Sequence, residues 1–343
     1  MRGMGRRRPL KPLERASRRI LARMLVGRPG RVSACEPPEP RSVLVVRPDS
    51  RLGNLVLVLP LLDGLRRRFP DARVTLLASD RFAVLPAGQG YDVLPVAKAR
   101  MASHPWLFPG FAGRLRGFGF DCAIDASHPF SFSLSGAVAC RLSGAGTRIG
   151  SETGGQEGWY THLVSGMSPG DHESRTLHRL GSLWTGWPGF SRPALKPRVA
   201  SSPGGIGLHV GASRGKFIPR EMLAGIVAGL CRMGRVTLFW SGPEEHATAA
   251  GLAGPGAAVS PALDIDGLLS AFSGLDILVT ADNGPMHVAS ALGVPVLALF
   301  RFPNQARFGP LSEGSRVLYD PGGPPVEMVL ETARAMLTGS GRG

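Results

Sequence analysis

Short apolar runs alternate along most of the chain with longer stretches in which apolar residues recur every three or four positions. In the first half, the runs predict strands at residues 41–49, 71–79 and 120–128, and the periodic stretches predict helices at 53–69 and 131–142. Continuous apolar strands of this kind are typical of a parallel sheet that helices cover on both faces. The first half is therefore predicted to be an α/β domain.

The same alternation starts again after a passage rich in proline and serine at residues 190–204. The second half has predicted strands at 206–213, 235–242, 276–282 and 294–300, and predicted helices at 219–233, 264–275 and 285–293. Two successive α/β domains with a cleft between them are the natural architecture. Ligands are expected at the carboxyl ends of the strands.

Charge changes this picture at the N-terminus. The 343-residue chain has a formal net charge of +15, but residues 1–31 alone hold eleven basic residues and one acidic residue. Within them, residues 13–25 have the pattern of a basic amphipathic helix, which predicts peripheral contact with an anionic membrane, a helix docked on the protein's own body, or a frayed arm. Because most of the excess charge lies in this arm, we expect no nucleic-acid partner.

The cysteine content and the hydropathy of the chain indicate in which cellular compartment the protein is expected. The four cysteines form no CxxC pair and have no histidine at metal-ligand spacing, so neither a disulfide framework nor a zinc site is expected. The sequence shows no apolar run of membrane-spanning length and no apolar core of a secretory signal. We therefore expect a cytoplasmic protein that is peripheral at the inner membrane face if the arm binds lipid.

The most specific string is DILVTADNGPMHVASALGVPVLALF, at residues 276–300. A strand is expected to end at Asp282, Gly284 allows a sharp turn, and Pro285 suits the first position of a helix. The free N–H groups of a helix N-terminus bind phosphate, and His287 in the first turn can donate to an oxygen of a sugar or phosphate. The ordinary alternative is that the polar residues cap the helix and that the histidine is structural.

Three other segments resemble phosphate-binding or metal-binding motifs but do not match them. The glycines of GAGTRIG, at residues 144–150, follow a predicted helix, whereas a dinucleotide-binding loop follows a strand. HVGASRGKF, at residues 209–217, lacks the first glycine and the hydroxyl residue of a P-loop. Asp264 and Asp266 stand at the start of a predicted helix, so helix capping is favoured over metal binding. No metal is expected.

Residues 276–300 resemble the donor-site motif of the heptosyltransferase family, glycosyltransferase family 9, in which Asp-x-Gly-x-x-His precedes a small-residue helix and a Gly-x-Pro strand. The matching residues are Asp282, Gly284, His287, Gly293 and Pro295. With less specific segments, the resemblance covers about residues 41–335. It implies a GT-B fold, in which two Rossmann-like, doubly wound domains face a central cleft. The expected division is an arm and linker at 1–40, an acceptor-side domain at 41–195, and a nucleotide-sugar domain with a C-terminal helix at 196–343.

The resemblance implies inverting transfer of a sugar, with heptose as one candidate, from a nucleotide-diphosphate sugar to a lipopolysaccharide-type glycolipid or another surface polysaccharide. Lys216 matches a lysine at the donor diphosphate, where a cation stabilises the charge left on the departing nucleotide. No cofactor is implied. Arg301, where the family has glycine, is expected to bring bulk and charge near the donor. The implied donor-binding residues are Ser213, Arg214, Lys216, Glu245, Asp282, Asn283, Gly284, Pro285, Met286 and His287.

The candidate catalytic loop departs from the family. Its Gly-Asp pair, whose aspartate is taken as the general base, is Gly53-Asn54 here. An amide cannot hold a proton at useful pH, so Asn54 cannot be that base. Asn54 can cap the following helix while Asp49, Asp125 or His128 accepts the proton. Two alternatives are a slow enzyme that relies on orientation of the substrates, since loss of a general base costs about 10²–10⁴ in rate, and a catalytically impaired homologue that binds a nucleotide sugar without transferring it.

Overall fold

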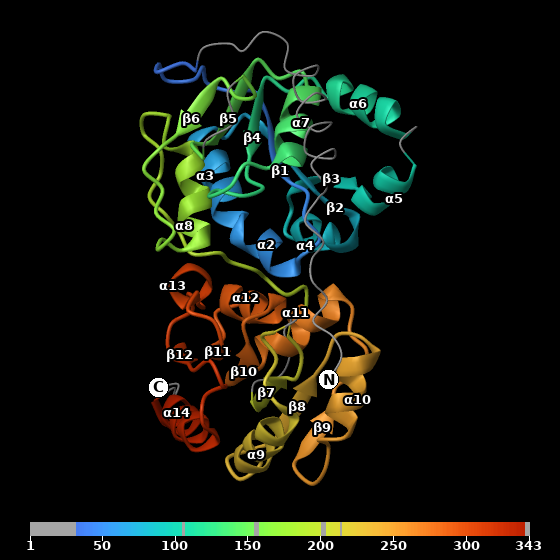
Figure 1. Cartoon of the computed structure of the whole chain (residues 1–343), viewed down its shortest axis with the longest axis vertical. Coiled ribbons are helices and arrows are strands. Elements are labelled where there is room, and N and C mark those ends of the chain that lie inside the picture. Colours follow the sequence, from blue (N-terminus) through green and yellow to red (C-terminus); the bar gives the residue numbers. More distant parts are fainter. Residues whose placement is uncertain (1–31, 105–106, 154–157, 200–203, 213–214, 340–343) are drawn as a thin grey trace, which may run out of the picture.

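Two six-stranded sheets, each covered by helices, lie one above the other in the computed structural model (Figure 1). The structure describes residues 32–104, 107–153, 158–199, 204–212 and 215–339. Neighbouring strands are parallel throughout both sheets. The predicted α/β architecture of two successive parallel sheets is confirmed.

The first sheet is doubly wound, with the strand order β3-β2-β1-β4-β5-β6. The Val43–Val46 segment of the central strand β1 is fully buried, because helices cover both faces. The order reverses between β1 and β4, and a crevice opens at the carboxyl ends of strands at such a point. The strands are β1 (Ser42–Arg47), β2 (Arg73–Ser79), β3 (Asp92–Val96), β4 (Cys122–Asp125), β5 (Thr147–Ser151) and β6 (His162–Val164).

The single helix predicted at residues 53–69 is two helices. Pro60 lies in the first turn of α3, where its missing N–H is tolerated, and the break falls at Val58. The helices of this half are α2 (Leu52–Leu57), α3 (Leu59–Arg68), α4 (Val84–Gly88), α5 (Lys98–Ser103), α6 (Phe108–Gly117), α7 (Leu134–Leu142) and α8 (Glu173–His178), with 3-10 turns η1 (Asp80–Phe82) and η3 (Arg179–Gly181).

The second sheet repeats the same winding, with the order β12-β11-β10-β7-β8-β9 and its reversal between β7 and β10. Its strands are β7 (Ile206–His209), β8 (Val236–Phe239), β9 (Ala257–Val259), β10 (Ile277–Ala281), β11 (Val296–Phe300) and β12 (Arg316–Tyr319). Its helices are α9 (Arg220–Leu230), α10 (Pro243–Ala250), α11 (Ile265–Ser273), α12 (Gly284–Ala291), α13 (Gln305–Phe308) and α14 (Val326–Gly339). The Asp264 side chain accepts from the Gly267 N–H at 2.8 Å and caps α11, as predicted.

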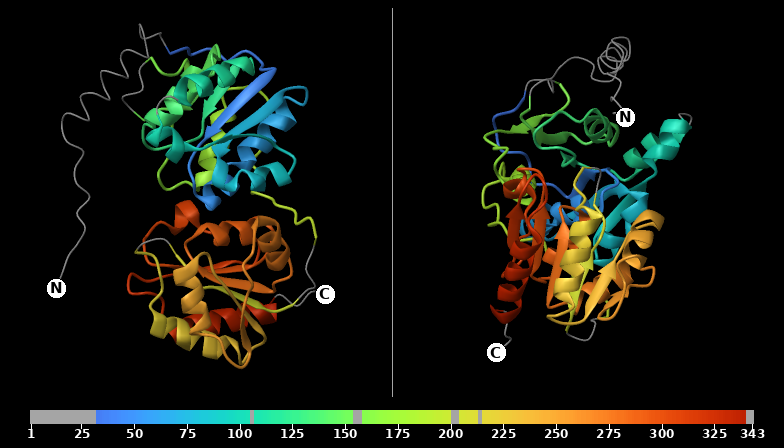
Figure 2. Two further views of the ribbon diagram at one scale, coloured as in Figure 1. Left: turned by 90° about the vertical axis from the view of Figure 1, so that its right-hand side faces the viewer. Right: turned by 60° about the horizontal axis from the view of Figure 1, so that its bottom comes forward.

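The two halves meet through helices that follow the central strands. Figure 1 shows α2 and α8 of the upper half facing α12 and α13 of the lower half, and Figure 2 shows the same stacking from two other sides. Leu55 and Leu57 of α2 share one buried apolar cluster with Met286 and Val288 of α12. Because α2 follows β1 and α12 follows β10, the carboxyl ends of both sheets face this junction.

Several expectations concern residues or boundaries that this fold leaves open. The basic arm, including residues 13–25, lies outside the described residues. In the described part of the chain, no helix combines the length and the apolar character needed to cross a membrane. The domain boundaries at residues 40/41 and 195/196 stay predictions, although both sheets fall within them. The four cysteines are free thiols.

Candidate active site

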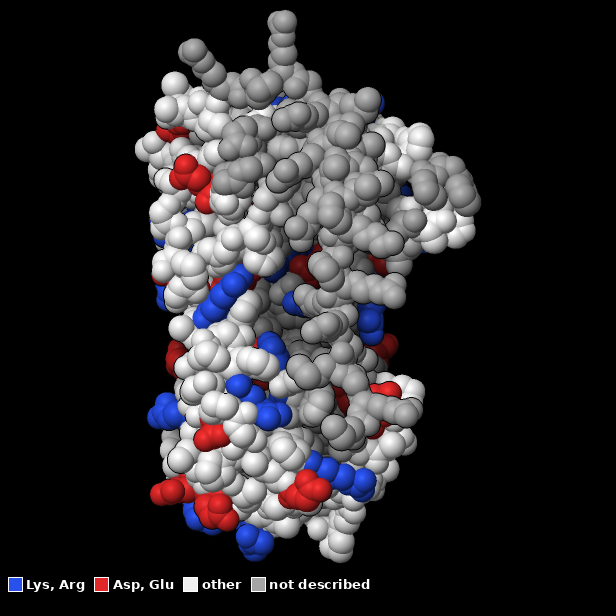
Figure 3. All heavy atoms as spheres, viewed as in Figure 1, with Lys and Arg blue, Asp and Glu red and all other residues white. Residues whose placement is uncertain are grey.

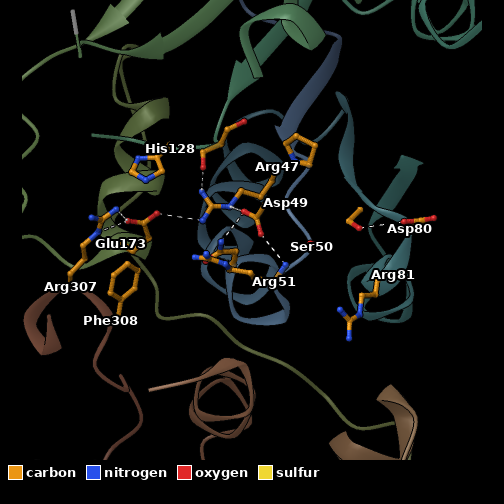
Figure 4. Close-up of a pocket in the computed structure, with 14 residues that line it drawn as sticks. Arg47, Asp49, Ser50, Arg51, Asp80, Arg81, His128, Glu173, Arg307 and Phe308 are labelled. Atoms are coloured by element: carbon orange, nitrogen blue, oxygen red, sulfur yellow. Dashed lines mark hydrogen bonds and ion pairs between the residues drawn. The ribbon is translucent and has the colours of Figure 1, made fainter. Parts of the chain in front are cut away.

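A cavity of about 710 Å³ lies at the carboxyl end of the first sheet (Figure 4). Its volume is in the range of small-molecule sites. Arg307 and Phe308 reach it from α13, and the other lining residues belong to the first half. The lining residues are Arg47, Pro48, Asp49, Ser50, Arg51, Asn54, Ser79, Asp80, Arg81, Ser127, His128, Glu173, Arg307 and Phe308.

Asp49 and Asn54 lie together at this cavity. Asn54 is inside the first turn of α2, which begins at Leu52, and its side chain caps nothing there, so the capping role considered for it is wrong. Its Nδ2 donates to Asp49 Oδ2 at 2.8 Å, and the Arg51 N–H donates to Asp49 Oδ1 at 3.1 Å. Arg47 Nε lies 3.2 Å from Asp49 Oδ2. The amide therefore orients a carboxylate, whose side chain keeps 30% exposure.

The other two base candidates lie in different surroundings. Asp125 is buried, accepts hydrogen bonds from the Ser127 N–H and the Tyr160 hydroxyl, and is not among the residues that line the cavity. Burial raises the pKa of Asp125, and these hydrogen bonds oppose the rise. His128 lines the cavity, and desolvation lowers the pKa of its ring. A neutral imidazole can accept a proton, so the structure brings His128, but not Asp125, to the cavity with Asp49.

Three charged residues that the sequence analysis did not single out shape the cavity. Figure 4 shows the Arg47 guanidinium between Asp49 and Glu173, with Arg307 on the far side of Glu173. Arg47 and Glu173 are almost completely buried. Arg47 could have been identified from the sequence, because it is a charged residue at the end of a strand that is otherwise mostly apolar. The sequence around Glu173 and around Arg307 gives no such indication.

Unpaired cations lie on the rim of the same cavity. Among the described residues, Arg51 and Arg81 line the cavity and have no carboxylate within ion-pair distance. Basic side chains gather where the two halves meet on the face shown in Figure 3. In the described ranges, no group of three His, Cys, Asp or Glu residues can hold a metal ion. The cavity thus offers guanidinium groups to an anionic ligand.

The predicted donor-binding residues that the structure describes lie together at the switch point of the second sheet. Lys216 forms an ion pair with Asp282, which is buried at the end of β10 and also accepts from Asn304 Nδ2 at 3.0 Å. Asn283 accepts from the Met286 N–H at 3.0 Å, so it caps α12, and its Nδ2 donates to the Gly211 carbonyl at 2.7 Å. These contacts join the carboxyl ends of β7 and β10. Ser213 and Arg214 lie outside the described residues.

Glu245 lies over the loop that follows β7. It accepts from the Ser241 N–H at 2.7 Å, and a Cβ built at Gly211 would meet its carboxyl carbon at 1.9 Å. Burial raises the pKa of Glu245. The absence of a side chain at residue 211 therefore lets this carboxylate approach the switch point, beside the Asn283 contact to the Gly211 carbonyl.

Arg301 supports the lysine loop. Its Nη1 donates to the Phe217 carbonyl at 2.9 Å and its Nε to the Pro321 carbonyl at 3.1 Å. The expectation that its bulk and charge lie near the donor stays a prediction. Arg301 ties the segment that carries Lys216 to the end of β12, and Asn304 is a further partner of Asp282 that the sequence analysis missed.

The N-terminus of α12 faces α2 across the junction. A Cβ at Gly53 would lie 2.5 Å from His287 Cδ2, and a Cβ at Gly284 would lie 3.1 Å from the Leu52 Cβ. His287 is buried, and burial lowers its pKa to about 4, so the ring is neutral near pH 7 and keeps one N–H to donate. Pro285 occupies the first turn of α12, as predicted.

Replacing Gly53 with Ala is expected to lower the free energy of unfolding by about 1–3 kcal/mol, because the methyl group forces the His287 ring or α2 to move in a packed junction. Urea unfolding of the full chain measures this. Gly113→Ala is the matched control, since Gly113 lies within α6 and a Cβ there meets nothing within 4 Å. Equal stability of the two variants would contradict the close contact.

Comparison with known proteins shows which protein family the chain is similar to. Residues 205–324 match the model of glycosyltransferase family 9 (heptosyltransferase). Lipopolysaccharide heptosyltransferase 1 of Pseudomonas aeruginosa is 26% identical over 277 residues, which cover 75% of this chain and 78% of that protein. Lipopolysaccharide heptosyltransferase 1 of Escherichia coli K12 is 24% identical over 288 residues, or 75% and 87% of the two chains.

Solved structures have the same fold. The Escherichia coli heptosyltransferase WaaC with ADP superposes with a TM-score of 0.69 at 20% identity, covering 87% of this chain and 99% of that chain. A glycosyltransferase family 9 structure from Veillonella parvula gives a TM-score of 0.73 at 17% identity, covering 90% and 100%. These similarities confirm the GT-B fold expected from the sequence.

Proposed function

We propose that the chain, whose residues 205–324 match the glycosyltransferase family 9 model, is a member of that family and transfers a sugar, with inversion, from a nucleotide-diphosphate sugar to a lipopolysaccharide-type acceptor. The observation that carries the proposal is the pairing of two sites at one junction. One site holds the partly exposed carboxylate of Asp49 at a cavity, and the other holds Lys216 with Asp282 at the switch point of the second sheet. A base for the acceptor and a cation for the donor are what such a transfer needs.

Asp49 is the proposed general base. Two hydrogen bonds, from the Asn54 amide and the Arg51 N–H, and an ion pair with the Arg47 guanidinium hold its carboxylate. In the proposed step, an acceptor hydroxyl attacks the anomeric carbon from the face opposite the diphosphate and gives its proton to Asp49. A glycosidic bond forms, the bond from the anomeric carbon to the diphosphate oxygen breaks, and nucleoside diphosphate leaves. His128 is the alternative base at the same cavity.

The donor site supports departure of the diphosphate. Lys216 and the capped N-terminus of α12 place positive charge at the switch point, where negative charge develops on the leaving group. We assign neither a metal nor another cofactor to the step. Glu245 and Asn283, which surround the loop after β7, are proposed donor contacts.

The acceptor is proposed to carry an acidic group. Arg51 and Arg81 on the rim of the Asp49 cavity suit a phosphate or carboxylate, and lipopolysaccharide heptosyltransferases are relatives of the chain. Peripheral contact of residues 13–25 with an anionic membrane would bring the protein to a lipid-linked acceptor. The sugar is a heptose in this proposal.

The proposal is tested by titrating ADP-, GDP-, UDP- and dTDP-sugars into the full-length protein by calorimetry, and then by following label from the bound donor into heptose-free lipopolysaccharide. We expect saturable binding of one donor and transfer of its sugar. Binding without transfer would favour the impaired homologue suggested by Asn54. Binding of no donor would overturn the glycosyltransferase proposal.

A further inference from the structure

Glu173, at the start of α8, is a buried carboxylate that joins the two halves. Its Oε2 lies 2.7 Å from Arg307 Nη2 and 2.9 Å from Arg307 Nε, and Arg307 belongs to α13 of the second half. Its Oε1 lies 3.4 Å from Arg47 Nη2 in the first half. One carboxylate therefore binds two guanidinium groups from opposite sides of the junction, with the shorter contacts to Arg307 (Figure 4).

The same network reaches the proposed base. Arg47 Nη1 donates to the carbonyls of Ala126 and Ser127, its Nη2 faces Glu173, and its Nε faces Asp49 at 3.2 Å. The guanidinium is almost fully buried, so Glu173 and Asp49 are its two carboxylate partners in a site that water screens poorly. A change in the ion pair between Glu173 and Arg47 therefore alters the ion pair between Arg47 and Asp49.

Two further contacts near the Glu173–Arg307 pair join the α13 region to the first half. His172 Nε2 lies 3.0 Å from the Gly309 carbonyl, within hydrogen-bonding distance, directly beside the Glu173–Arg307 pair. The Arg307 guanidinium also lies over the Phe130 ring, 4.6 Å from its centroid. Residues 172–173 of the first half therefore contact residues 307–309 of the second half through both an ion pair and a polar contact.

We propose that Arg307 is a positioning residue that, through Glu173 and Arg47, fixes the orientation of Asp49 when the second half is seated on the first. With Arg307 in place, Glu173 is satisfied and Arg47 remains available to Asp49. Without it, the buried Glu173 carboxylate keeps only Arg47 as a charged partner and draws that guanidinium away from Asp49. The inference rests on the proposed transfer reaction and adds that the donor half aligns the base of the acceptor half.

A double-mutant cycle in the full-length chain tests this coupling, because Arg307 acts on Asp49 only through two other side chains. We expect Arg307→Met to lower kcat by about tenfold, with the KM of donor and acceptor within about threefold of wild type. In an Asp49→Asn background the same change should have no further effect on kcat, measured with labelled donor over long incubations. Arg307→Lys should recover part of the loss, since it keeps the charge but not the paired geometry.

Arg192→Met is the matched control, because it removes an exposed ion pair to Glu313, 3.2 Å long and outside the cavity, and should leave kcat unchanged. Thermal unfolding verifies that every variant is folded. Losses that add in the double variant, or an effect on KM alone, would reduce Arg307 to a contact between the halves and overturn its positioning role. Absence of transfer by the wild-type protein would overturn the proposed reaction itself, so the two failures are distinguishable.

Discussion

Asp49→Asn is expected to lower kcat for sugar transfer by about 10²–10⁴-fold, because the amide retains the shape of the carboxylate but cannot accept the hydroxyl proton. Asp49 is the candidate base that both lines the cavity and is held by Arg47, Asn54 and the Arg51 N–H. Calorimetric affinity for the donor should stay close to that of wild type, since the donor is assigned to the second half. Initial rates with saturating donor and acceptor measure the effect.

Two further variants make the Asp49 result specific. Asp71→Asn changes an exposed carboxylate that precedes β2, at the opposite end of the first sheet from the cavity, and should leave kcat unchanged. His128→Asn removes the alternative base at the cavity. If His128→Asn abolishes transfer while Asp49→Asn retains it, the imidazole is the base and the Asp49 assignment is wrong.

Lys216→Met is expected to lower kcat/KM by about 10²–10³-fold, because the positive charge beside the departing diphosphate is lost. The change also leaves the Asp282 carboxylate, buried at the end of β10, with Asn304 as its hydrogen-bonding partner, so donor affinity should weaken as well. Lys216→Arg keeps the charge and should recover part of the rate. Calorimetry and initial rates together separate the binding effect from the effect on the chemical step.

Lys196→Met provides the matched control for Lys216→Met. Lys196 is exposed in the connection between the two sheets, and the hydrogen bond that its backbone N–H makes to Gln89 Oε1 at 2.8 Å survives the substitution. Equal kcat/KM values for the two methionine variants would show that the charge at residue 216 takes no part in the reaction.

The sequence predicted the second-sheet site better than the first. Asp282 and Asn283 follow a fully buried apolar strand, and the glycine and proline after them mark the start of α12, so local chemistry places them at a strand end. Asp125 also ends a buried strand, yet Tyr160 and Ser127 enclose it. Which end-of-strand carboxylate remains open depends on side chains from other elements, and periodicity does not reveal that.

The charged network between the halves could not be predicted for a related reason. Arg47 and Glu173 are 126 residues apart, and Glu173 lies 134 residues before Arg307. Ion pairs on protein surfaces are common, and this network is informative because Arg47 and Glu173 are buried. The role of Asn54 was misjudged because α2 starts two residues before it, which directs its amide toward Asp49 rather than toward a helix terminus.

The close contact between Gly53 and His287 also bears on how tightly the protein can hold its donor. In this arrangement α2 covers the imidazole that the proposed function gives to the donor. If the donor reaches His287 from the side that Gly53 covers, it binds molecules in which α2 and α12 have moved apart. Its apparent dissociation constant then equals the intrinsic constant divided by the fraction of such molecules, so packing at this junction sets the donor concentration at which the protein responds.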